Sequence, residues 1–292
     1  MMDYVKPNEV LSAMIEAGRN KAELSILQLI VRGGLGGAIL ACATTLAYTA
    51  AAQTKIPMIG ALLFPVGFVM IILLGFELVT GSFALIPLAV LEKKTSTARM
   101  LNNFFWVIIG HLLGCAVYAA LYGLTITKMG TDMTNPMIQT LITTSEAKTI
   151  AYKSMGADGM GLAFIKAILC NWMVTLGAVM AMTSKSTTGK IAAMWLPILT
   201  FFGQGFEHTV VNMFVIPAGM MLGANVSFGD WWLWSGIPVL LGNLVGGVLF
   251  TGILIYLAQN GFKAKSSASA TGIPSGHGEG AIAKTAALEK SL

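Results

Sequence analysis

Six long apolar stretches dominate this sequence and constrain its fold more than any other feature. They span about residues 27–51, 57–91, 101–127, 161–183, 191–222 and 231–258. A helix needs about 20 apolar residues to cross the ~30 Å hydrocarbon core of a bilayer, and several of the stretches exceed this length. Charged residues make up 11% of the chain, whereas soluble domains contain about 25%. The pattern therefore predicts an all-α membrane protein with six transmembrane helices.

The second and fifth stretches are too long for one straight span, and each contains glycine and charge near its middle. The interruptions fall at residues 75–81 and 203–209. Unpaired backbone groups at membrane depth are tolerated only where they are buried in protein or line a wet cavity. We therefore predict that helices 2 and 5 are broken at mid-membrane. The half-helix that follows each break would present its positive end to a passing solute, which favours an anion.

Three segments of the first half recur in the second half at similar spacing. Residues 32–34, 75–77 and 110–114 match residues 166–168, 205–207 and 242–246, at offsets of 134, 130 and 132 residues. Each half contains three spans, an odd number, so the second copy must enter the membrane upside down. Two inverted three-helix repeats with matching broken helices are typical of transporters and pores.

Loop charges predict the direction of the chain in the membrane. Lys93, Lys94 and Arg99 follow the second span, and Lys185 and Lys190 follow the fourth. The positive-inside rule then places both termini in the cytoplasm, in a plasma or inner membrane. These basic loops also account for the net charge of +5, so that charge does not indicate a nucleic-acid partner. We predict three parts: an amphipathic cytoplasmic segment at 1–26, a channel domain at 27–258, and a disordered cytoplasmic tail at 259–292.

Three motifs give the chain a resemblance to a known family. They are Gly-Phe-Glu-Leu-Val-Thr-Gly at 75–81, Cys-Asn-Trp-Met-Val at 170–174, and Gly-Phe-Glu-His-Thr-Val-Val-Asn-Met-Phe at 205–214. With six spans around them, the sequence resembles the formate/nitrite transporter family over about residues 5–258. The resemblance implies a homopentamer of aquaporin-like protomers, each with its own pore for a small monovalent anion.

His208 is the central candidate residue, since an ionisable group at mid-membrane is costly unless it functions. An imidazole can donate a hydrogen bond to an anion or exchange a proton near neutral pH. The alternative is a buried histidine that takes no part in transport. The resemblance matches His208 to the family's central histidine and Thr80 to its loop threonine. Thr80 could donate to an anion or to His208, or only cap its helix.

The resemblance also implies a lysine outside the outer constriction, and several supporting residues. Lys153 is our choice for the lysine and Lys148 the alternate, although a solvated lysine explains either equally well. We expect Glu77 and Glu207 to bind loop amides, and we expect hydrogen bonds from Asn171 and Asn212 to cross-link the spans. We also place Asn171 on the substrate pathway, together with His208, Thr80 and the lysine. We assign no chemistry to His111. The family pattern places apolar constrictions at Phe68, Leu78 and Val79 on the cytoplasmic side and at Phe64, Val174 and Phe201 on the outer side.

These features favour bidirectional transport of formate or nitrite. A dry constriction is costly for a bare ion and far easier for its neutral acid, so a proton from solvent or His208 could accompany the anion. Passage of the anion itself, and transport of hydrosulfide, acetate or lactate, remain alternatives. A neutral-solute channel would carry two Asn-Pro-Ala turns, whereas we interpret Asn-Pro-Met at 135–137 as an extramembrane turn. No sequence motif indicates an enzyme, a cofactor or a metal site.

Overall fold

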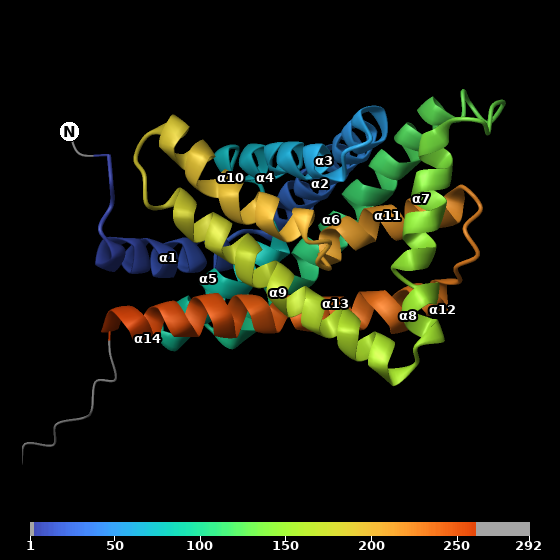
Figure 1. The fold of residues 1–292 in the computed structure, drawn as a ribbon. Coiled ribbons are helices and arrows are strands. Elements are labelled where there is room, and N and C mark those ends of the chain that lie inside the picture. The colour runs from blue at the N-terminus through green and yellow to red at the C-terminus, as the bar shows by residue number, and fades with distance from the viewer. Residues whose placement is uncertain (1–2, 261–292) are drawn as a thin grey trace, which may run out of the picture. The chain divides into compact units, whose positions relative to one another are not determined.

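The computed structural model describes residues 3–260, whose regular elements are all helices, with no β-strand among them (Figure 1). The predicted tail at 259–292 lies outside these residues, apart from Gln259 and Asn260 at the end of the last helix. The helices in chain order are α1 Pro7–Ala22, α2 Ile26–Thr54, α3 Pro57–Leu63, α4 Pro65–Leu73, α5 Val79–Leu91, α6 Thr97–Ile126, α7 Pro136–Ala147, α8 Ile150–Ser154, α9 Ala157–Ala181, α10 Thr187–Gly203, α11 Thr209–Met221, α12 Phe228–Trp231, η1 Trp232–Gly236, α13 Ile237–Val245, η2 Gly246–Ile253 and α14 Leu254–Asn260, where η1 and η2 are π-helical.

Four continuous helical stretches within residues 3–260 are long and apolar enough to cross a membrane. They are α2, α6, α9 and the run from Phe228 to Asn260. The second predicted stretch is instead built from α3, α4 and α5, and the fifth from α10 and α11. In both stretches the helix stops and a new helix begins after five intervening residues, which are 74–78 and 204–208.

A left-handed glycine ends the helix at both interruptions. Gly75 has φ +68°, a conformation that is costly for any residue with a Cβ atom. The chain therefore turns back, and Phe76 N–H donates to Ile71 O over 2.9 Å, which closes the end of α4. The same turn recurs at Gly205, with φ +65°. Four residues after each glycine, α5 and α11 begin, each 13 residues long.

Glycines let the long helices of each half approach closely. A Cβ atom on Gly114 of α6 would lie 1.9 Å from Gly34 O of α2. In the second half, a Cβ atom on Gly246 would lie 2.4 Å from Ile168 O of α9. The repeated Gly-x-x-x-Gly motifs therefore serve helix contacts within one chain.

We expect Gly114→Ala to destabilise the protein, because the added methyl group has no room between α2 and α6. Overpacking of this kind costs about 1–3 kcal/mol. Gly123→Ala, on the same helix, is the matched control, since a Cβ atom there meets nothing within 4 Å. The control should be neutral or more stable, because alanine favours a helix over glycine. Thermal unfolding in detergent compares the two variants, and equal midpoints would contradict the expectation.

A short helix precedes the three long elements of each half. The apolar side of α1, with Val10, Leu11 and Met14, packs against Leu85 and Leu88 of α5. In the second half, α7 packs against α11. Figure 1 shows α1 and α7 at opposite ends of the helix bundle. Each half of the chain therefore consists of a short leading helix followed by the predicted spans.

Residues 128–160, which connect the third and fourth predicted spans, are not one long loop, because α7 and α8 lie within them. The Asn-Pro-Met segment is the start of α7 and not an isolated turn. Asn135 accepts a hydrogen bond from Met137 N–H over 2.9 Å, and proline at the first helical position needs no partner for an N–H group. Ser145 Oγ then donates to Ile216 O over 3.1 Å, which fastens α7 to α11.

Hydrogen bonds fasten the N-terminal segment to the turn between α9 and α10. Asp3 accepts from Ser184 Oγ over 2.8 Å and from Ser186 N–H over 2.7 Å. These donors favour the ionised carboxylate, so the pKa of Asp3 lies below its ordinary value, with the Ser184 hydrogen bond as the main cause. The entry to α1 is therefore held against the second half of the chain.

Candidate functional site

The two interruptions meet at a hydrogen bond between buried side chains. Thr80 Oγ1 lies 3.1 Å from His208 Nε2, and both side chains are almost inaccessible to solvent. Thr80 is the second residue of α5, and His208 is the residue that caps α11. The structure therefore brings together the two central candidates of the sequence, which lie 128 residues apart.

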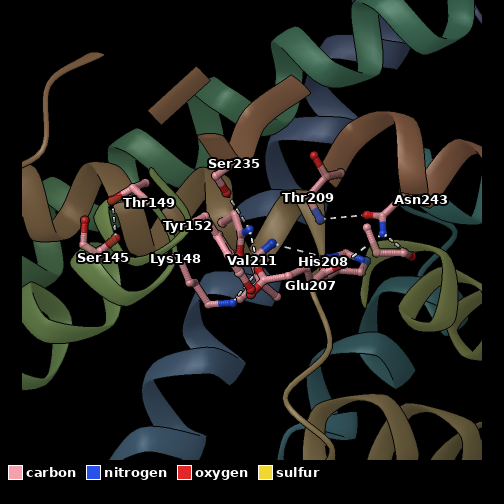
Figure 2. Close-up of polar contacts among 12 residues, drawn as sticks. Ser145, Lys148, Thr149, Tyr152, Glu207, His208, Thr209, Val211, Ser235 and Asn243 are labelled. Atoms are coloured by element: carbon pink, nitrogen blue, oxygen red, sulfur yellow. Dashed lines mark hydrogen bonds and ion pairs between the residues drawn. The ribbon is translucent and has the colours of Figure 1, made fainter. Parts of the chain in front are cut away.

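The hydrogen bonds of His208 determine which ring nitrogen carries the proton. Val211 N–H donates to His208 Nδ1 over 3.3 Å (Figure 2), so this nitrogen is an acceptor. In a neutral imidazole the other nitrogen is then the donor. His208 Nε2–H therefore donates to Thr80 Oγ1, and the hydroxyl hydrogen of Thr80 is left to donate to a third group.

Three side chains converge on the carboxylate of Glu207 (Figure 2). Lys148 Nζ and Asn212 Nδ2 each donate to Oε2 over 2.8 Å, and Tyr152 OH donates to Oε1 over 2.8 Å. The Glu207 side chain is 3% exposed and that of Lys148 is 15% exposed, so the pair is largely withdrawn from water. Asn212 also donates to Ser235 Oγ over 3.0 Å, which links α11 to η1.

A cavity of ≈140 Å³ adjoins His208 and Lys148. Its walls include the aromatic side chains Tyr48, Phe201 and Phe206. Lys153, our first choice for the outer lysine, is not among the residues that line this cavity. Its ammonium group is 2.8 Å from Asp230 Oδ1, and half of the side chain is exposed. The structure therefore places the alternate, Lys148, beside the candidate site.

The first interruption carries a matching ion pair and a second cavity. Lys21, at the end of α1, donates to Glu77 Oε2 over 2.8 Å, and Ser82 Oγ donates to the same oxygen over 3.3 Å. The adjoining cavity has a volume of ≈320 Å³, and its walls include Lys21, Phe76, Glu77 and Lys190. Each Gly-Phe-Glu loop therefore holds its glutamate against a lysine at the end of a short leading helix. Our expectation that these glutamates bind loop amides is wrong, because the donors to their carboxylates are side chains.

The six residues expected at the constrictions are buried in one apolar cluster with the site. Phe201 stacks on the His208 ring, with centroids 5.6 Å apart and planes at 25°. Phe64 meets Phe201 edge-on, with centroids 5.6 Å apart. The predicted set lies entirely in this cluster: Phe64, Phe68, Leu78, Val79, Val174 and Phe201. One face of the imidazole is therefore covered by the ring of Phe201.

Asn171 supports the site from α9 and does not line either cavity. Its Nδ2 donates to Thr80 O over 3.1 Å and to Asn243 O over 2.6 Å. The amide therefore links α9 to α5 and α13, which is the cross-linking role that we expected. Within residues 3–260, no group of three or more His, Cys, Asp or Glu side chains could hold a metal ion.

Comparison with known proteins decides the family. The sequence model for formate/nitrite transporters matches residues 8–257. The chain belongs to the formate/nitrite transporter family. It is 34% identical to the uncharacterized transporter YrhG of Bacillus subtilis (strain 168), over 89% of this chain and 95% of that protein. It is 31% identical to a probable formate transporter of Methanothermobacter thermautotrophicus, over 87% of this chain and 96% of that protein.

The fold is also that of the formate/nitrite transporters. A solved structure described as a pentameric formate channel with formate bound is similar, with a TM-score of 0.65 and 24% sequence identity. The similarity covers 80% of this chain and 97% of that one. These matches confirm the family resemblance and identify the chain as a membrane transport protein of this family.

Sequence reasoning missed two residues of the candidate site. Lys21 could have been found, because it precedes Lys148 by 127 residues, close to the offset of the other repeated segments. Tyr152 gives no such signal, because its contact with Glu207 depends on how α8 packs against α9. Only the structure assigns it to this formate/nitrite transporter site.

We expect Tyr152→Phe to raise the KM for anion flux with little change in its maximal rate. Without the phenol, Glu207 has only Lys148 and Asn212 as donors, and the carboxylate then binds the ammonium group more tightly. Lys148 would be less available to an entering anion. The concentration dependence of flux into proteoliposomes measures this effect, with Tyr4→Phe at an exposed position as control. An unchanged KM would show that Tyr152 does not act on Lys148.

Proposed function

We propose that this chain passes formate, nitrite or a closely related small monoanion across a membrane, through the two cavities and past Thr80 and His208. The observation that carries the proposal is the arrangement of the two Gly-Phe-Glu loops. Each loop holds a lysine–glutamate pair beside a cavity. His208, which lines one of these cavities, is hydrogen-bonded to Thr80 among apolar side chains.

In this proposal α4 with α5, and α10 with α11, each form one interrupted span of a six-span protein. The two breaks lie at mid-membrane, and both termini lie in the cytoplasm of a plasma or inner membrane. The left-handed glycines and the matched starts of α5 and α11 support the inverted arrangement. The loop lysines and arginine at 93, 94 and 99 support the orientation.

The lysines recruit the anion. Lys21 at one end and Lys148 at the other are positive groups at the walls of the two cavities, and a positive potential raises the local concentration of anions. The paired glutamates keep the lysines in place without presenting a free negative charge, since each carboxylate is bound by donors.

The apolar residues determine in which form the solute crosses. A bare anion loses its hydration between Phe201, Leu78 and Val79, whereas a neutral weak acid loses much less. We infer that solvent in the cavity from which the anion enters supplies the proton. His208 is an unsuitable carrier, because a second proton on Nδ1 would displace Val211 N–H and add charge at the positive end of α11. His208 and Thr80 then act as hydrogen-bond donors to the solute as it passes.

The relatives support a formate-class substrate and a pentameric assembly. A relative of 31% identity is described as a probable formate transporter, and the similar solved structure as a pentameric formate channel. The cavity of ≈140 Å³ beside His208 and Lys148 suits a solute of a few heavy atoms. We therefore propose a homopentamer in which each protomer carries its own pathway.

Flux into proteoliposomes tests this function. The purified full chain is reconstituted, and uptake of formate, nitrite, hydrosulfide, acetate and lactate is followed at several external pH values. We expect formate or nitrite uptake to exceed that of empty liposomes and to increase as the pH falls, because the fraction of neutral acid increases. Glycerol uptake at the level of empty liposomes is the expected control. Glycerol uptake without anion uptake would contradict the proposal and favour a neutral-solute channel.

A further inference from the structure

The inverted repeat places an imidazole in one half where the other half has an amide. Gly110-His111-Leu112 on α6 corresponds to Gly242-Asn243-Leu244 on α13. Both side chains are fully buried, and neither lines the cavities described above. His111 is therefore a buried ionisable side chain at a position where the other half of the chain has Asn243, which cannot ionise.

Both ring nitrogens of His111 are bound to the backbone. His111 Nδ1 lies 2.7 Å from Gly33 O, and Val79 N–H donates to Nε2 over 3.1 Å. A carbonyl can only accept, so Nδ1 carries the proton and Nε2 is the acceptor. His111 is thus neutral, with the opposite tautomer to His208.

Asn243 makes the same two contacts in the second half. Its Nδ2 donates to Ala167 O over 2.8 Å, and its Oδ1 accepts from Thr209 N–H over 2.8 Å (Figure 2). Ala167 and Gly33 are the middle residues of the matched segments 166–168 and 32–34. The two side chains therefore link equivalent points of the two halves.

The contacts of His111 and Asn243 lie at the starts of α5 and α11 and determine where these helices begin. Val79 and Thr209 are the first residues of α5 and α11, and the N–H groups of a first turn have no partner within the helix. His111 supplies that partner for Val79, whose neighbour Thr80 carries the hydroxyl that meets His208. A displacement of Val79 would therefore displace the hydroxyl of Thr80.

We propose that His111 is the positioning residue of the Thr80 half-helix, and that it does with an imidazole what Asn243 does with an amide for the His208 half-helix. This inference rests on the proposed function of the Thr80–His208 pair. His111 does not touch the solute. It acts by binding Val79 N–H, which places Thr80 within reach of His208 and of the passing anion.

Asparagine can replace histidine at position 111, but histidine cannot replace asparagine at position 243 without loss of a hydrogen bond. Asn243 has a second N–H, which donates to Glu207 O over 2.9 Å, whereas a neutral imidazole has only one N–H. An amide at position 111 can make both contacts of His111. An imidazole at position 243 must leave Ala167 O or Glu207 O without its donor. The proposal therefore predicts that exchange is tolerated at one position only.

Formate flux through reconstituted protein tests the proposal with His111→Asn, His111→Leu and Asn243→His. We expect His111→Asn to stay within about twofold of the unchanged protein, since both backbone partners are satisfied. His111→Leu and Asn243→His should each lose about tenfold or more, because buried backbone groups lose their partners. Wild-type flux in His111→Leu, or a folded His111→Asn variant without flux, would overturn the proposal.

A measurement of the histidine tautomers does not depend on transport or on the folding of the leucine variant. ¹⁵N-labelled histidine in the intact protein should show an Nδ1–H tautomer for His111 and an Nε2–H tautomer for His208. His111→Asn should remove the first set of signals and leave the second. An Nε2–H or cationic His111 would overturn the proposal. If the unchanged protein carried no anion, the proposed function would fail, and the tautomers would still decide whether His111 binds Val79.

Discussion

Replacing His208 by leucine is expected to reduce anion flux by about a hundredfold or more, the combined effect of losing a donor to the solute and the cap of a half-helix. His208→Asn is expected to keep most of the flux and its dependence on pH. An asparagine Oδ1 can accept from Val211 N–H, as His208 Nδ1 does, and its Nδ2 can donate to Thr80. Flux of formate or nitrite into proteoliposomes across a pH series measures both variants.

The asparagine variant separates the two roles that the sequence leaves open for His208. If the histidine only donates a hydrogen bond, flux through His208→Asn still increases as the external pH falls. Should the variant carry anions with no dependence on pH, His208 would be the group that delivers the proton, and the solvent route that we propose would be wrong. His111→Asn is a matched control, because it removes a second buried imidazole from the same region.

Lys148→Met is expected to lower both the stability of the protein and the anion flux. The substitution leaves Glu207 as a buried charge without its cation, and breaking such a pair costs about 3–5 kcal/mol. The double variant Lys148→Met with Glu207→Gln should recover stability, since no isolated charge remains. It should not recover flux, because the positive group at the cavity beside His208 is still missing. Thermal unfolding in detergent and flux into proteoliposomes measure the two effects.

Lys153→Met is the matched control for Lys148→Met. Lys153 pairs with Asp230 at the surface, and exposed pairs contribute only about 0–1 kcal/mol. We expect this variant to keep both stability and flux. A loss of flux in Lys153→Met that equals the loss in Lys148→Met would mean that our first choice from the sequence was correct.

The interruptions and their central residues could be predicted from the sequence because they depend on local features. Gly75 and Gly205 end their helices through their own backbone conformation. The similar offsets of the repeated segments then imply that the two loops are equivalent. Thr80 and His208 follow these glycines at short distances, so their proximity followed from the inverted repeat.

The helices α7 and α8 could not be predicted in the same way. The segment Pro136–Ala147 contains several threonines, a serine and a glutamate, and it is too short for a search based on spans of about 20 apolar residues. Such a helix is stable mainly because it packs against a neighbour, here α11. The choice between Lys148 and Lys153 depended on this packing, because α7 directs the chain so that Lys148 reaches Glu207.

The sequence alone determined the all-helical membrane fold, the family, and the two loops with Thr80 and His208, because hydropathy, the positions of glycines and the spacing of repeated segments can be read directly along the chain. Only the tertiary structure decided which lysine faces each glutamate, that Tyr152 binds Glu207, and which nitrogen of His111 and His208 carries the proton. Apart from the contact between Val211 and His208, these features are contacts between residues that are 32 to 128 positions apart. Their partners are determined by the close packing of whole helices, which no local pattern of residues encodes.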